Sequence, residues 1–214
     1  SQLSGKDALI FIGISVAGFA LAYLFSFLVV RLIMAKKEDR GVFQYMTVFG
    51  NAGFMGYPVM EAIFGAQSAF FVALYNVPFN LISYSIGIAL LTGGQSGGKI
   101  KFKDFLNMPL ISAVVAVLIF ASGIKMPAVI KETASILGNA TTPAAMAIMG
   151  STLALIPIKK VFSNPRVYVF AVIKLIVLPT IAWLILRNFM AVDSMSFGIS
   201  VMLLAMPVAT NTTM

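Results

Sequence analysis

The residues of this chain that could do chemistry are polar side chains placed at breaks in otherwise apolar segments. The clearest break is Gly50-Asn-Ala-Gly-Phe-Met-Gly-Tyr-Pro58, which has three glycines and one proline in nine residues. A helix loses roughly 1 kcal/mol for each internal Gly and about 3 kcal/mol for an internal Pro, so a continuous helix is disfavoured here. We predict two half-helices joined inside the membrane, with four candidate substrate-binding residues at the join: Asn51, Gly53, Gly56 and Pro58.

Unwound backbone inside a membrane needs polar neighbours. Each unpaired N–H or C=O group costs several kcal/mol in hydrocarbon, so the break must face protein or a water-filled cavity. A helix N-terminus that ends there carries about half a positive charge, which suits a carboxylate. The alternative is a packing kink, because small residues also mediate contacts between helices.

The last part of the chain repeats this arrangement. Residues 8–60 read as a long apolar span, a polar turn and an apolar run that breaks, and residues 167–214 read the same way. The first unit begins on one side of the membrane and the second on the other, so we predict an inverted repeat. Broken helices at matching positions of such repeats point to a transporter's binding site. The second break adds three candidate binding residues: Pro207, Thr210 and Asn211.

A lysine inside an apolar span is a further candidate. Lys174 lies eight residues beyond Arg166, which is about 12 Å deeper along a helix. A lysine at mid-membrane costs roughly 2.5–3.5 kcal/mol, so it needs a reason to be there. Lys174 is either a counter-charge or proton-coupled switch for an anionic substrate, or a side chain that snorkels to the interface.

Two other spans contain polar or helix-breaking residues. Asn139-Ala-Thr-Thr-Pro143 lies in the middle of the span expected over 127–156, which we predict to be kinked or broken there. Threonine hydroxyls that satisfy the freed carbonyls are an equally good explanation of this motif. In the preceding half of the chain, Tyr75, Asn76 and Asn80 do not share one helix face, so only one or two of them would reach a cavity. The candidates taken from these two spans are Asn76, Asn139, Thr142 and Pro143.

Composition makes the membrane the solvent of this protein. Hydrophobic residues make up 60% of the 214-residue chain and charged residues 10%, against about 25% charged in soluble domains. Cysteine and histidine are absent, which excludes thiolate or imidazole metal sites, Cys or His nucleophiles and disulfides. The spans supply too few acid–base groups for an intramembrane enzyme, so we predict no catalytic residue, metal or cofactor.

The basic residues indicate topology. Loops 31–41, 93–104 and 157–166 hold ten of the fifteen Lys and Arg residues, and the positive-inside rule makes these loops cytoplasmic. The formal net charge of +8 therefore needs no nucleic-acid partner.

Four motifs in order resemble the auxin efflux carrier family: Asn51-Ala-Gly-Phe-Met-Gly-Tyr-Pro58, Gly138-Asn-Ala-Thr-Thr-Pro143, Lys174-Leu-Ile-Val-Leu-Pro179 and Met206-Pro-Val-Ala-Thr-Asn211. The resemblance spans essentially the whole chain. It implies an all-α polytopic fold of ten spans in two inverted five-helix repeats, in which the fourth and ninth spans cross as broken helices. The chain would be truncated at both ends and divided into the end of the first repeat, a short cytoplasmic linker and the second repeat to the first half of the ninth span: 1–92, 93–104 and 105–214.

The resemblance also implies a function. We expect a secondary transporter of small organic anions, such as malate, malonate or auxin-like weak acids, that works by alternating access and is coupled to a proton or a sodium ion. The short linker favours a bacterial member in the inner membrane, and a homodimer through the scaffold spans is expected. The alternatives are a non-transporting sensor on the same fold, or a sodium/proton antiporter, although the paired intramembrane carboxylates usual in such antiporters are not seen.

Overall fold

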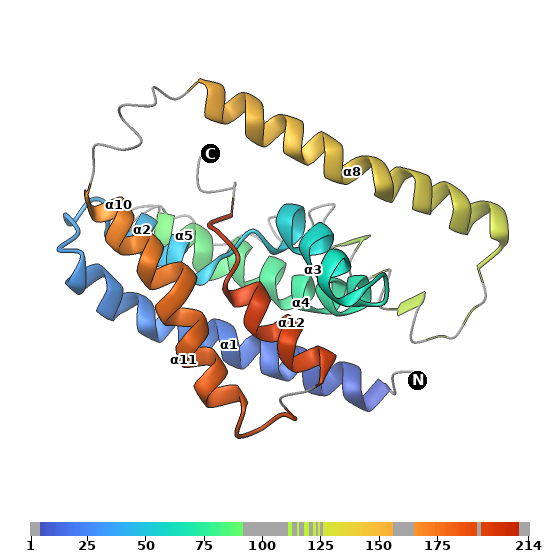
Figure 1. Cartoon of the computed structure of the whole chain (residues 1–214), viewed down its shortest axis with the longest axis horizontal. Coiled ribbons are helices and arrows are strands. Elements are labelled where there is room, and N and C mark those ends of the chain that lie inside the picture. Colours follow the sequence, from blue (N-terminus) through green and yellow to red (C-terminus); the bar gives the residue numbers. More distant parts are fainter. Residues whose placement is uncertain are drawn as a thin grey trace.

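The computed structural model describes residues 5–91, 126–155, 165–191 and 194–209, together with single positions between 111 and 124. Every named element in these ranges is helical, and most of the helices form one bundle (Figure 1). The linker expected at 93–104 and most of the span expected at 105–123 lie outside the described residues. In the described part of the chain, three helices are long and apolar enough to cross a membrane: Asp7–Leu32, Ser68–Leu91 and Pro165–Leu186.

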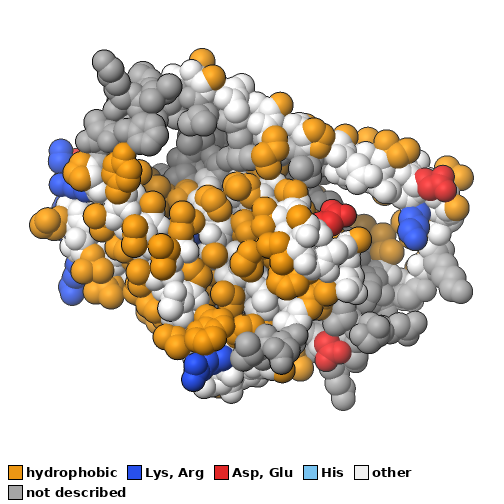
Figure 2. Space-filling model, viewed as in Figure 1, with side chains coloured by type: hydrophobic (Ala, Val, Ile, Leu, Met, Phe, Trp, Pro, Cys, Tyr) orange, Lys and Arg blue, Asp and Glu red, His pale blue; other side chains and the backbone are white. Residues whose placement is uncertain are grey.

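Helix α1 (Gly5–Leu32) is the longest element of the bundle. Asp7 in its first turn and Arg31 in its last turn have the charge signs that the helix dipole favours. Phe19 is buried toward α2 and α4, whereas Leu24 is 69% exposed on the opposite side. The space-filling view shows apolar side chains over much of the bundle and charged ones near its edges (Figure 2). An apolar outer face of this kind suits contact with lipid.

The segment expected to break does so over three residues. Helix α2 (Arg40–Val48) ends before Phe49, and the chain turns helical again in η1 (Ala52–Gly56), a π-helix that leads into α3 (Tyr57–Phe64). The prediction of two half-helices is therefore confirmed, but the unwound part is only 49–51. Gly53, Gly56 and Pro58 belong to the second half-helix. Pro58 is tolerated because it occupies the first turn of α3, where a missing N–H costs least.

Two further spans of the bundle also contain a π-helical turn. The third span consists of α4 (Ser68–Ile82), η2 (Ser83–Gly87) and α5 (Ile88–Leu91). A later span consists of α10 (Pro165–Val172), η3 (Ile173–Val177) and α11 (Leu178–Leu186). Helix α12 (Met195–Leu204) begins at the N-cap Ser194 and ends before the second predicted break.

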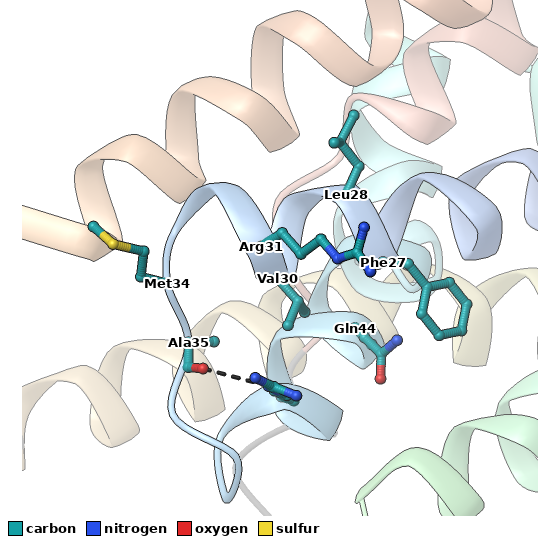
Figure 3. Close-up of a pocket in the computed structure, with 8 residues that line it drawn as sticks. Phe27, Leu28, Val30, Arg31, Met34, Ala35 and Gln44 are labelled. Carbon is teal, nitrogen blue, oxygen red and sulfur yellow. Dashed lines mark hydrogen bonds between the residues drawn. The ribbon is translucent and has the colours of Figure 1, made fainter.

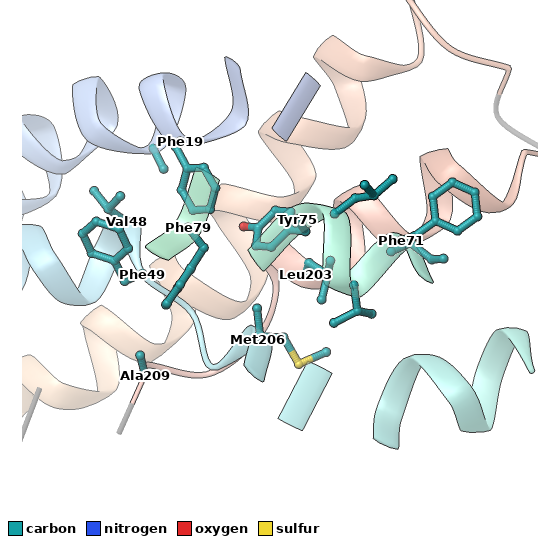
Figure 4. Close-up of a cluster of buried hydrophobic side chains, with 14 of the residues drawn as sticks. Phe19, Val48, Phe49, Phe71, Tyr75, Phe79, Leu203, Met206 and Ala209 are labelled. Atoms are coloured by element: carbon teal, nitrogen blue, oxygen red, sulfur yellow. The ribbon is translucent and has the colours of Figure 1, made fainter. Parts of the chain in front are cut away.

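Aromatic side chains fill the core of the bundle around the first break (Figure 4). The ring of Phe49, which is fully buried, lies 4.6 Å from that of Tyr45 and 5.5 Å from that of Phe79, measured between centroids. The ring of Phe19 lies 4.9 Å from that of Tyr75. Such pairs contribute about 0.5–1.5 kcal/mol each beyond their burial. The break is therefore anchored on one side by close packing.

Helix α8 (Ala128–Ala154) lies apart from the other helices in Figure 1. Its described side chains are exposed, and it approaches the bundle at η1. Of the kink or break predicted near Pro143, a break is absent, because α8 continues through Pro143. A proline removes only one backbone donor, here the one that would pair with the Asn139 carbonyl, and a long helix can absorb that loss.

Candidate functional site

The two predicted breaks meet and pair through their backbones. The amide N of Asn51 donates to the carbonyl O of Pro207 at 2.6 Å, and the amide N of Ala209 donates to the carbonyl O of Phe49 at 3.2 Å. Gly50 and Val208 form the isolated antiparallel bridge between these bonds. We call residues 49–51 and 207–209 the crossing. Unwound backbone at the crossing thus obtains partners from the other break, as the cost of unpaired groups requires.

Gly50 allows this close approach. A Cβ atom at Gly50 would lie 3.1 Å from the carbonyl O of Met206 and 3.3 Å from that of Leu203. Both contacts are to backbone atoms, which cannot swing aside as a side chain could. A glycine is therefore the residue that fits at the centre of the crossing.

Asn51 caps the second half-helix. Its side chain is 4% exposed, and its Oδ1 accepts a hydrogen bond from the amide N of Phe54 at 3.2 Å. A cap of this kind satisfies one of the free N–H groups of a helix N-terminus. Two residues further on, Gly53 faces open space, because a Cβ atom there would meet nothing within 4 Å. At the start of η1, the Asn51 side chain is therefore buried, whereas Gly53 has free space beside it.

Lys174 reaches the end of the first half-helix. Its side chain is 1% exposed, and its Nζ donates to the carbonyl O of Thr47 at 2.8 Å. That carbonyl belongs to the last turn of α2, where backbone oxygens lack helical partners and the dipole favours a cation. The ammonium therefore does not snorkel to the interface. It is brought to the crossing by η3, the π-helical turn that contains Lys174.

Asn76 lies beside the second half-helix. It lies on α4, which packs against α3, and its Nδ2 donates to the carbonyl O of Val72 at 2.8 Å. Asn80 makes the same kind of bond to the carbonyl O of Asn76. Tyr75, by contrast, is buried in the aromatic core. The side chains of Asn76 and Asn80 thus donate to carbonyl groups of their own span.

The other predicted binding residues are placed only in part. Pro207 is exposed and supplies its carbonyl to the crossing. Asn139 and Pro143 are exposed on α8. The side chain of Thr142 and all of Thr210 and Asn211 lie outside the described residues. The structure thus pairs Asn51 with Pro207 and places the Lys174 amino group at Thr47, four residues before Asn51. The roles of all these residues in binding stay predictions.

Sequence analysis did not identify two main-chain partners at this site, those of Lys174 and Gly50. The Thr47 carbonyl and the backbone of Val208 take part through main-chain atoms that every residue carries. No side-chain type could have marked them. The position of Gly50 was the one available signal, since it begins the glycine-rich motif.

The crossing has an electrostatic character suited to an anion. The N-terminus of η1 lies at the crossing, the Lys174 amino group is bound at the adjacent end of α2, and residues 49–51 and 207–209 carry no carboxylate. Among the described residues, no group of three or more His, Cys, Asp or Glu side chains could hold a metal ion.

Residues 4–214 match the model of a family described as membrane transport protein. The chain belongs to this family, which is that of the auxin efflux carriers. Its membership and its apolar helices make it an integral membrane protein. The family match covers both breaks and Lys174, so the crossing is part of the family's shared region.

Two relatives in the family have names that mention transport. An uncharacterised transporter of Methanocaldococcus jannaschii is 30% identical over 62% of this chain and 44% of its own length. A Rhizobium meliloti protein named "putative malonate transporter" is 26% identical over 94% of this chain and 63% of its own length. The chain therefore spans less than two thirds of either relative. No solved structure matches it.

Proposed function

We propose that the protein is part of a secondary transporter that moves small organic anions across the membrane by alternating access. The observation that carries this proposal is the backbone pairing of Asn51 with Pro207, which joins the break between α2 and α3 to the segment after α12 in a chain of the membrane transport protein family. Crossed broken helices create a polar site that needs few formal charges.

The proposed whole protein has ten spans in two inverted repeats. In support, α1 is followed by the broken pair α2 and α3, and the span from α10 to α11 is followed by α12 and the second break. The antiparallel pairing of the breaks agrees with a two-fold relation between these units. The division at 1–92, 93–104 and 105–214 and the cytoplasmic placement of the basic loops belong to this proposal.

The proposed substrate is a carboxylate held at the crossing. The N-terminus of η1 and the amide of Asn51 would bind it, the charge of Lys174 would offset its own, and Thr210 and Asn211 would complete the site. A small dicarboxylate is favoured because one relative is named for malonate. A proton or a sodium ion would drive transport.

In the proposed transport motion, the bundle moves relative to α8. Helices α1 to α5 and α10 to α12 pack together, whereas the most extensive contact of α8 with them, among the described residues, is at η1. The bundle would carry the crossing past a scaffold that includes α8, with a homodimer formed through scaffold spans.

The test is uptake by proteoliposomes that contain the full-length protein. Labelled mono- and dicarboxylates would be presented with imposed proton or sodium gradients. We expect saturable uptake of one acid that responds to one gradient, and its loss in Asn51→Ala and Asn211→Ala. Binding without flux for every acid would support a sensor instead, and unaltered transport in both variants would refute the site.

A further inference from the structure

We propose that an anionic phospholipid binds where α1 meets α2, with its phosphate between Arg31 and Arg40. A pocket of about 940 Å³ lies at this junction, which is within the usual size range of ligand sites. Figure 3 shows the residues that line it. They comprise two arginines, one amide and five apolar side chains: Arg31, Arg40, Gln44, Phe27, Leu28, Val30, Met34 and Ala35.

The polar side of the pocket fits a phosphate group. Arg31 and Arg40 are both exposed, and the described lining contains no carboxylate. The Nε of Arg40 donates to the carbonyl O of Ala35 at 3.5 Å, which orients the rest of its guanidinium group. Two guanidinium groups and the Gln44 amide supply the donors that phosphate oxygens accept.

The apolar side of the pocket continues along the membrane face of α1. Leu24, Phe27 and Leu28 are 69%, 49% and 49% exposed, and together with Arg31 they follow helical spacing on one face. This stripe leads from the middle of the span to the guanidinium group. A lipid acyl chain can lie along the stripe while its phosphate reaches Arg31. A soluble dicarboxylate has no apolar tail to occupy it.

The depth of Arg31 suits a headgroup. The uncharged run from Ala8 to Val30 has 23 residues, which as a helix spans about 34 Å and slightly exceeds the roughly 30 Å of hydrocarbon. Arg31 follows directly, at the level of lipid phosphates. Basic pockets between helices at this level recognise anionic headgroups.

The experiment uses full-length protein in detergent and native mass spectrometry with added dioleoyl phosphatidylglycerol. The test variant is Arg31→Gln/Arg40→Gln. Its matched control is Lys36→Gln/Lys37→Gln, which removes the same charge from the same loop outside the described lining. We expect the test variant to bind this lipid about thirtyfold more weakly, at about fivefold for each arginine, and the control to change it less than threefold.

Competing ligands separate the sources of phosphate. Phosphatidylcholine and glycerol 3-phosphate should displace phosphatidylglycerol poorly, because one lacks net charge and the other lacks acyl chains.

Equal losses in the two double variants would show diffuse surface charge and overturn the proposal. So would displacement by glycerol 3-phosphate at equal concentration, or the absence of saturable lipid binding to the wild type. If the double variant does not fold, Arg31→Gln alone should lose about fivefold and Arg31→Lys should retain most of the affinity.

Discussion

Lys174 and Thr47 are 127 residues apart in the sequence, yet the Lys174 ammonium is hydrogen-bonded to the Thr47 carbonyl at 2.8 Å. The bond connects the span of α10 and α11 to the end of α2, one residue before Val48 and the crossing. A buried cation is therefore placed where a helix ends and its dipole is negative. This relationship gives Lys174 a structural role beside its proposed electrostatic one.

Replacing Lys174 should separate these roles. Lys174→Met leaves the Thr47 carbonyl without this donor, which costs about 1–3 kcal/mol, and we expect a lower Tm and little anion uptake. Intrinsic fluorescence of Trp183 during heating reports the Tm. The matched control is Lys37→Met, an exposed lysine in a loop, which should leave the Tm unchanged. Normal uptake by folded Lys174→Met protein would rule out Lys174 as a counter-charge.

Substitutions of Asn51 distinguish a helix cap from a substrate ligand. Asn51→Ala removes the cap on Phe54 and should lower stability by about 1 kcal/mol. Asn51→Asp keeps a capping oxygen but places a negative charge beside the proposed anion site. We expect Asp to restore the Tm and to bind the anion more weakly than Ala does, as measured by the Kd for the labelled acid. If Asp restores both properties, Asn51 is only a cap.

Two glycines in one motif give a matched pair for the crossing. In Gly50→Ala the new methyl group would press on the carbonyls of Met206 and Leu203, at a cost of about 1–3 kcal/mol. Gly53→Ala places the same group in open space. We expect a lower Tm for Gly50→Ala and an unchanged or higher one for Gly53→Ala. Equal Tm values would mean that the close approach at Gly50 does not hold the breaks together.

The absence of native cysteine makes thiol labelling of the proposed cavity direct. Gly53→Cys should react with a charged, water-soluble methanethiosulfonate reagent and be protected by substrate, because the break would face water. Leu24→Cys is the control, since Leu24 is 69% exposed on the apolar outer face of α1, which is expected to contact lipid. Hydrocarbon suppresses the reactive thiolate, so this variant should react slowly. Similar rates at both positions would argue against a water-filled site at η1.

The sequence predicted the breaks better than the connections between them. Glycine and proline spacing placed a break at 50–58, because those residues destabilise a helix wherever they occur. It could not show that only 49–51 unwinds or that Pro207 supplies the partner carbonyl, since backbone pairing leaves no side-chain signature. The same rule failed at Pro143, where the helix continues. The position of Lys174 inside an apolar span indicated that its amino group needs a partner, but it could not identify Thr47 as the acceptor.

Main-chain pairing at the crossing determines which amino-acid substitutions this region can accept during evolution. The bonds from Asn51 to Pro207 and from Ala209 to Phe49 use only amide and carbonyl groups, so the joint tolerates many side chains provided that Gly50 stays small. Substrate selectivity could then change through substitutions at neighbouring positions such as Gly53, while the backbone pairing at the crossing is kept. The same crossing could in this way be present in carriers for different solutes.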